Sequence, residues 1–284
     1  MIHDEELRSQ IDYSAGQREA AKRVLIELVG LFHEYEDELR IVGGWVPDLL
    51  FPEAGHVGSV DVDVLINHIT LQDTGYLTMS KILLKNGYKE HPEKYFSFVK
   101  TVCVCGEDYD VDVDILAGMY GGTQEKKRSQ HVQGMKALKA TGGNFAFSFD
   151  PNRIRLEGHR TDGALDIAHV NVIAVVPYLV MKTAALGRGK AKDAYDIYFL
   201  ISHYHGGYKL LAKEFKEYAE LEIIKKMMQK LNEKFMSPRH TGPMDVSDFM
   251  ELETESEEAM GVRADAYAQI QALLDEIKKI QVSK

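Results

Sequence analysis

The run SVDVDVLI at residues 59–66, preceded by Gly43-Gly44-Trp45, decides the expected fold. Side chains alternate between the two faces of a β-strand, so the valines point to one face and Asp61 and Asp63 project together from the other. Two like charges this close repel each other unless a cation or a proton lies between them. Proteins hold Mg2+ with a few carboxylates together with phosphate oxygens. The pattern indicates a strand that carries a metal site; the alternative is a half-exposed strand with two solvated acids.

Two glycines upstream favour the metal site over the solvated strand. Gly43 and Gly44 follow a short apolar segment and precede a predicted helix at residues 45–51. Glycine lets the backbone approach a ligand closely, and the amides at a helix start can face a phosphate. We therefore expect a nucleotide-binding turn at this glycine pair.

A third carboxylate is expected from a neighbouring strand, because a two-metal site needs about three carboxylates. Residues 95–116 predict a β-hairpin with its turn at residues 106–109. Asp110, Asp112 and Asp114 lie on one face of its second strand. Asp114 is the first candidate because it lies deepest in the apolar run, and Asp112 is the second. Asp110, beside the turn, is expected to be solvated.

The composition is that of an ordinary globular protein. The chain has 284 residues, is 45% hydrophobic and 27% charged, and carries a net charge of -10. A nucleic-acid partner would therefore have to meet a local basic patch. No apolar run approaches the roughly 20 residues that cross a bilayer, and the polar start is not a signal peptide, so we expect a cytoplasmic protein without a membrane partner. Cys103 and Cys105 are expected to be half-buried, reduced residues.

One segment departs from the acidic composition. Residues 118–143 are rich in glycine and carry five basic residues against one acid, a local charge of +4, from Lys126, Lys127, Arg128, Lys136, Lys139 and Glu125. Two interpretations stay open: a mobile solvated loop, or a loop that faces phosphate or RNA.

The remaining periodicity predicts an α+β fold. We expect helices at residues 17–36, 72–86, 178–186, from 192 onward, 209–234, 246–258 and 263–280, and further strands at 145–149, 153–156 and 169–176. This layout predicts a mixed α/β domain at 1–170 followed by a helical domain at 171–284.

Several of these segments together resemble a known family. Gly-Gly-Trp, an Asp-x-Asp strand and a later Val-Asp-Ile-Leu strand are similar to the DNA-polymerase-β-type nucleotidyltransferases. More narrowly, the chain resembles the AbiEii/AbiGii-type nucleotidyltransferases, which include toxins of bacterial toxin–antitoxin and abortive-infection systems. The segments that carry this resemblance are IVGGWVPDLL (41–50), HVGSVDVDVLI (56–66) and VPYLVMKTAALGRGKAKDAYDIYFLI (176–201). It covers about residues 20–205, and the last third carries no such motif.

The resemblance implies a polymerase-β-like core, a mixed sheet with flanking helices, that binds an NTP with Mg2+ or Mn2+. Position by position it implies a nucleotide-binding turn at Gly43 and Gly44, a small hydroxyl residue at Ser59, metal ligands at Asp61, Asp63 and Asp114, a triphosphate contact at Lys182, and a further signature at Arg188, Lys192 and Asp193. Where many relatives have an arginine, this chain has Val57 beside His56. His56 is either a substitute for that arginine or a solvated loop residue.

The charged residues of this region also have structural interpretations that do not involve a nucleotide. Lys182 lies in an otherwise apolar helix, so its ammonium needs a partner or a cleft; the alternative is a snorkelling lysine. Asp193 and Asp196 are able to pair with Lys182 and Lys192, or to act only as charges at a helix start.

The expected activity is transfer of an NMP from an NTP to an acceptor hydroxyl. The resemblance implies RNA as acceptor, at the 3′ end of tRNA, with the 118–143 segment as the RNA contact and a cognate antitoxin as partner. A small hydroxyl compound such as an aminoglycoside is the second interpretation, since the acidity suits a cationic substrate. The third is a non-catalytic NTP-binding protein that uses the fold as a scaffold.

Overall fold

The computed structural model describes residues 8–71, 73–118, 129–132 and 135–282, with side chains described outside 73–77 and 129–136. The chain divides into two compact units. Among the described residues, unit 1 holds 13–52 and those within 57–177, and unit 2 holds 8–12, 53–56 and 178–282. Each unit is described by itself below. None of the described helices is both long enough and apolar enough to span a membrane.

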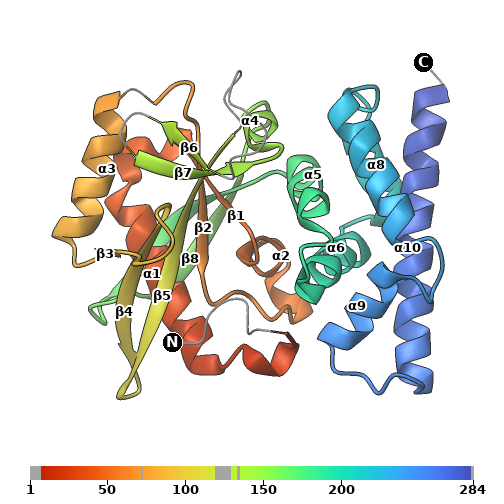
Figure 1. Ribbon diagram of the computed structural model, residues 1–284, viewed down its shortest axis with the longest axis horizontal. Coiled ribbons are helices and arrows are strands. Elements are labelled where there is room, and N and C mark those ends of the chain that lie inside the picture. The colour runs from red at the N-terminus through yellow and green to blue at the C-terminus, as the bar shows by residue number, and fades with distance from the viewer. Residues whose placement is uncertain (1–7, 72, 119–128, 133–134, 283–284) are drawn as a thin grey trace. The chain divides into compact units, whose positions relative to one another are not determined.

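Unit 1 is built on a mixed sheet (Figure 1), in which the strand order is β3-β4-β5-β2-β1-β9-β8. The strands are β1 (Leu39–Val42), β2 (Val62–Ile66), β3 (Lys89–Glu90), β4 (Ser97–Val104), β5 (Glu107–Gly118), β8 (Asn152–His159) and β9 (Leu165–Val172). β2 pairs with β5 and β1 pairs with β9 in parallel, whereas the other pairs along this order are antiparallel. β6 (Ser129–Val132) and β7 (Met135–Ala140) form a hairpin that joins the sheet through a parallel pairing of β7 with β5.

Helices flank this sheet. The helices of unit 1 are α1 (Ala15–Leu31), α2 (Trp45–Leu50), α3 (Asp73–Lys85) and α4 (Gly143–Ala146). Ser14 caps α1 by accepting a hydrogen bond from the Gln17 amide. α1 packs along β4, β5, β8 and β9 and buries an apolar stripe that includes Val24, Leu25 and Leu28. The predicted α+β class, a mixed sheet flanked by helices, is confirmed.

Two local predictions for unit 1 are wrong. Residues 145–149 form no strand; α4 occupies part of this segment, because Gly142 takes a left-handed φ of 87° just before it. The first residues of α4 pack tightly against the end of β5, because a Cβ on Gly118 would lie 1.8 Å from Asn144 Oδ1. The segment 118–143 is not one loop, since β6 and β7 lie within it.

The β4–β5 hairpin turns earlier than predicted. The turn residues are Cys105 and Gly106, with φ of 54° and 88°, so β5 already begins at Glu107. Two successive residues of positive φ match the twist of the flanking strands. Cys103 and Cys105 are free and exposed at the tip of this hairpin, not half-buried as expected.

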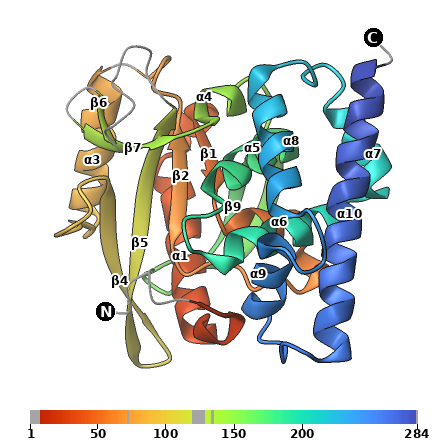
Figure 2. The ribbon, with the colours of Figure 1, turned by 45° about the vertical axis from the view of Figure 1, so that its right-hand side comes forward.

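Unit 2 is helical. It contains α5 (Val175–Ala185) from residue 178 onward, then α6 (Ala191–His203), α7 (Gly207–Glu214), α8 (Glu222–Lys234), α9 (Thr241–Phe249) and α10 (Glu257–Val282). The long α10 packs against α6, α7, α8 and α9 (Figure 2). The spacing of apolar residues in the sequence misplaced the ends of several of these helices. The predicted helix at 209–234 is broken between α7 and α8, where Phe215 and Ala219 are buried, and α9 begins and ends earlier than predicted.

Candidate functional site

The sheet of unit 1 brings carboxylates of two strands to one face. In the parallel pairing of β2 with β5, Asp63 lies opposite Asp114 and Val62 lies opposite Val113. Residues opposite each other in register project from the same face of a sheet. Val62 and Val64 are buried on the other face. Asp61 is the last residue before β2, and its charge contributes to the raised pKa of Asp114. The β2–β5 register therefore places Asp63 beside Asp114, and the electrostatics place Asp61 near them.

Gly43 makes room for one of these carboxylates. The pairing of Val42 with Asp63 brings the residue after β1 next to Asp63. Gly43 has a φ of 71°, and a Cβ there would lie 1.8 Å from Asp63 Oδ2. A side chain at this position would collide with the carboxylate, and the backbone conformation also favours glycine. Gly44 is the N-cap residue of α2.

The loop before β2 is held by contacts to Asp61. The Ser59 hydroxyl donates a short hydrogen bond to Asp61 Oδ1. The indole Nε1 of Trp45 donates to the Asp61 carbonyl oxygen at 2.8 Å. Both donors are buried. They fix the backbone and the side chain of Asp61 from the two segments that the sequence singled out, the Gly-Gly-Trp turn and the serine before the strand.

Asp114 is a buried carboxylate with an unsatisfied oxygen. Its Oδ1 has no hydrogen-bond partner among the described residues. Burial, with a further contribution from the charge of Asp61, raises the pKa of Asp114 to about 6, although a hydrogen bond from Ser97 opposes the shift. Asp112 instead pairs with Lys94, at 2.7 Å. Of the two candidates for the third carboxylate, Asp114 is the one that lies opposite Asp63. Lys94 also lowers the pKa of Asp114, but less than burial raises it.

These three side chains are not gathered as ligands in the structure. Within the described part of the chain, no three His, Cys, Asp or Glu residues form a set that could hold a metal ion. Two observations nevertheless fit a cation at this face. The orphaned Asp114 oxygen and the raised pKa of its carboxyl group are both unfavourable features that a bound cation would relieve.

Asp114→Asn is expected to stabilise the metal-free protein at pH 7 by about 1–3 kcal/mol. The folded-state pKa lies above the ordinary value of 3.8, so the folded protein holds this proton more tightly than the unfolded chain does. Wild-type stability therefore falls as the pH rises from 3.8 to about 6, and asparagine removes that loss. Urea unfolding at several pH values measures the difference.

The matched control is Asp110→Asn on the same strand, because the exposed Asp110 accepts a hydrogen bond from Thr101 Oγ1 at 2.6 Å. Its stability is expected to stay within about 1 kcal/mol of wild type at each pH. If Asp114→Asn instead lowered the free energy of unfolding at pH 7, the folded protein would accommodate the charge of Asp114 well.

Unit 2 holds a second cluster of charges, on α5, α6 and the 53–56 segment. Lys182 Nζ lies 2.8 Å from Asp193 Oδ1 and 2.8 Å from Asp196 Oδ2. Lys192 Nζ lies 2.9 Å from Asp196 Oδ1. His56 Nε2 lies 3.0 Å from the same Asp196 oxygen, and both of these side chains are fully buried. Asp196 is thus the centre of the cluster, with three nitrogen partners.

The electrostatics of this cluster are those of a closed ion-pair network. Burial alone would lower the pKa of Lys182, but Asp193 and Asp196 outweigh it and raise that pKa well above its ordinary value. Burial would raise the pKa of Asp196, but Lys182 and Lys192 hold it far below the ordinary value. Burial lowers the pKa of His56 to about 4, so its ring is neutral at pH 7. The two positive charges of the lysines therefore balance the two negative charges of the carboxylates.

This network settles two questions that the sequence left open. Lys182 and Lys192 pair with the carboxylates of α6, so neither is a snorkelling surface lysine. His56 is not a solvated loop residue; it is buried against Tyr195 and Phe199 with its Nε2 on Asp196. Arg188 stands apart from the cluster's ion pairs and is exposed in the turn between α5 and α6.

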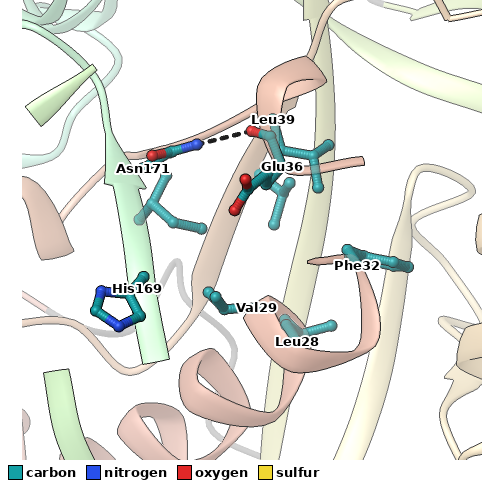
Figure 3. A pocket seen from close by; sticks show the side chains of 9 residues that line it. Leu28, Val29, Phe32, Glu36, Leu39, His169 and Asn171 are labelled. Carbon is teal, nitrogen blue, oxygen red and sulfur yellow. Dashed lines mark hydrogen bonds between the residues drawn. The ribbon is translucent and has the colours of Figure 1, made fainter. Parts of the chain in front are cut away.

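A separate pocket lies on the opposite face of the sheet in unit 1 (Figure 3). It is lined by Leu28, Val29, Phe32, Glu36, Leu39, Ile41, Val64, His169 and Asn171. Asn171 Nδ2 donates to the Glu36 carbonyl oxygen at 2.8 Å across it. Val64 and Asp63 project from opposite faces of β2, so this pocket and the carboxylates are on different sides of the sheet.

No family model, curated protein or solved structure matches the chain. The functional assignment therefore depends on the geometry above and on the resemblance of the motifs.

Proposed function

We propose that the protein is a metal-dependent nucleotidyltransferase with a polymerase-β-like core. The observation that carries the proposal is the register of β2 and β5, which sets Asp63 opposite Asp114, with the charge of Asp61 close enough to raise the pKa of Asp114. Carboxylates on neighbouring strands of a rigid sheet are suited to hold divalent ions at fixed positions. The strand pattern and the Gly-Gly-Trp turn that resemble this superfamily support the same conclusion.

The three carboxylates would hold Mg2+ or Mn2+ together with the phosphates of an NTP. Bound there, the ions would neutralise the phosphates and lower the pKa of an acceptor hydroxyl. The residues of the chain have separate tasks. Ser59 and Trp45 fix Asp61, and Gly43 leaves the space that Asp63 occupies. Burial raises the pKa of Asp114 to about 6, so its charge is unfavourable at neutral pH, and a bound cation would relieve that cost.

The nucleotide contacts beyond the carboxylates stay predictions. The resemblance assigns Gly44, Lys182, Arg188, Lys192 and Asp193 to the nucleotide. In unit 2 the ammonium groups of Lys182 and Lys192 already have carboxylate partners, so a phosphate would have to compete with Asp193 or Asp196 for them. Of these residues, Arg188 is the basic side chain that is exposed.

The proposed acceptor is RNA at a 3′ end, with a cognate antitoxin as a proposed partner. The predicted RNA contact rests on Lys126, Lys127 and Arg128, which lie outside the described residues; Lys139 of the same segment lies on β7. The net charge of -10 favours a second candidate, a cationic hydroxyl compound such as an aminoglycoside.

The proposal is tested by incubating the protein with each α-labelled NTP, Mg2+ and either total RNA or an aminoglycoside. We expect label on RNA, concentrated in the tRNA fraction, and dependent on the divalent ion. Label on the aminoglycoside alone would support the second candidate. NTP binding without label on either acceptor would contradict transferase activity and favour the non-catalytic alternative.

A further inference from the structure

Unit 2 contains a group of basic side chains that the α5–α6 ion pairs do not use. Arg188 lies in the turn after α5, and Lys230 and Lys234 lie one turn apart on α8. None of the three has a carboxylate within ion-pair distance among the described residues. In a chain with a net charge of -10, three close cations without such a partner are unexpected.

Two contacts bring α8 to the end of α5. Lys230 Nζ donates to the carbonyl oxygen of Ala184 at 2.9 Å, in the last turn of α5. A Cβ on Gly187 would lie 3.4 Å from Lys234 Nζ. The ammonium group of Lys234 therefore lies against the turn that carries Arg188. Both lysines are only partly exposed. Their heads are therefore held at the Gly187–Gly189 turn by the fold.

The acids nearest to this group are otherwise engaged. Asp193 bonds to Lys182 at 2.8 Å, and Glu233 accepts a hydrogen bond from Gln229 at 2.8 Å. Asp245 is half-buried near Lys234, and the charge of Lys234 lowers the pKa of Asp245 against the larger effect of burial, but the two groups form no ion pair among the described residues. Burial and the charges of Arg188 and Lys234 lower the pKa of Lys230, as expected where positive charges are not fully balanced.

We propose that Arg188, Lys230 and Lys234 form a binding site for a phosphate group of a polyanionic ligand. A guanidinium and two ammonium groups supply several charge-assisted donors to the oxygens of one phosphate. The ordinary role of Lys230 as a cap for α5 explains one of the three cations, but not Arg188 or Lys234. The site gives the C-terminal third of the chain a binding role for which its sequence carries no motif, and it does not require transfer activity.

The phosphate has two possible sources, the triphosphate of a nucleotide or the backbone of a nucleic acid. Titration calorimetry of the full chain with tripolyphosphate, and separately with a short single-stranded RNA, tests both. Lys230→Gln/Lys234→Gln is compared with Lys209→Gln/Lys213→Gln, which removes two positive charges from exposed positions one turn apart on α7. Lys234→Gln alone serves if the loss of the Ala184 contact unfolds the double variant.

We expect the double variant to lose at least about tenfold in affinity for one of the two ligands. Loss for tripolyphosphate identifies the nucleotide as the source. Loss for RNA identifies the backbone, and the dependence of log K on log salt should then weaken by about 0.7 for each lysine removed. Affinities for both ligands equal to those of Lys209→Gln/Lys213→Gln would overturn the proposal. Because the readout is binding, the site stands or falls separately from the proposed transfer reaction.

Discussion

Asp63→Asn is expected to slow Mg2+-dependent NMP transfer by about 10²–10³-fold or more while leaving the fold intact. Asp63 neighbours both other carboxylates, because Asp61 is two residues before it in the chain and Asp114 lies opposite it on β5. Asparagine keeps the size that fits over Gly43 but loses the charge that a divalent ion requires. The rate of label transfer at saturating NTP, measured with thermal melting of the same sample, checks both parts.

Two variants of β5 sharpen this test. Asp110→Asn makes the same chemical change at an exposed carboxylate near the hairpin turn and is expected to keep wild-type activity. Asp112→Asn is expected to keep most activity, since Asp112 is paired with Lys94. If Asp112→Asn lost activity and Asp114→Asn kept it, the third carboxylate of the site would be Asp112 and not Asp114.

Asp196→Ala is expected to destabilise the protein by about 3–5 kcal/mol. Asp196 is fully buried and contacts Lys182, Lys192 and His56. Removing it leaves two buried ammonium groups with one carboxylate, Asp193, and removes the partner of the His56 ring. The free energy of unfolding from chemical denaturation measures this loss.

Asp265→Ala is the matched control for Asp196→Ala. Asp265 accepts a hydrogen bond from the Tyr198 hydroxyl at 2.7 Å on the exposed surface of the same unit. Its loss is expected to cost about 1 kcal/mol or less. If the two variants proved equally stable, the network around Asp196 would not be a main determinant of stability.

The pH dependence of the Asp196 contribution has a definite sign. The folded-state pKa of Asp196 lies below its ordinary value of 3.8, so the stabilisation is fully present above that pH and is lost as the pH falls below it. The difference between wild type and Asp196→Ala should therefore shrink only in acid. His56 contributes a separate loss of stability as the pH falls from 6.5 to about 4, because burial lowers the pKa of its ring in the folded protein. This window lies above the one for Asp196.

Local sequence patterns predicted the elements that position the carboxylates. The alternation of Val and Asp defines β2 and β5, and strict alternation also fixes which side chains share a face. Glycine at position 43 indicated a close approach of the backbone, and the structure shows what approaches it, the Asp63 carboxylate. The choice between Asp112 and Asp114 needed the register of two strands that lie far apart in sequence.

Other features depend on contacts that no local pattern contains. The burial of His56 arises from Asp196, 140 residues away. Residues 145–149 have the aromatic composition of a strand, but the close packing of Gly118 against Asn144 and the left-handed Gly142 place the helical turn α4 at the start of this segment. The basic group of Arg188, Lys230 and Lys234 exists only because α8 packs on the end of α5.

The central claim is that Asp61, Asp63 and Asp114 support transfer of a nucleotide and not of a single phosphate. The most direct measurement compares transfer from α-labelled and γ-labelled NTP to the acceptor by the wild-type protein and by Asp63→Asn. We predict α label on the acceptor and γ label released as pyrophosphate, both lost in Asp63→Asn. γ label on the acceptor, or α-label transfer that survives in Asp63→Asn, would contradict the assignment.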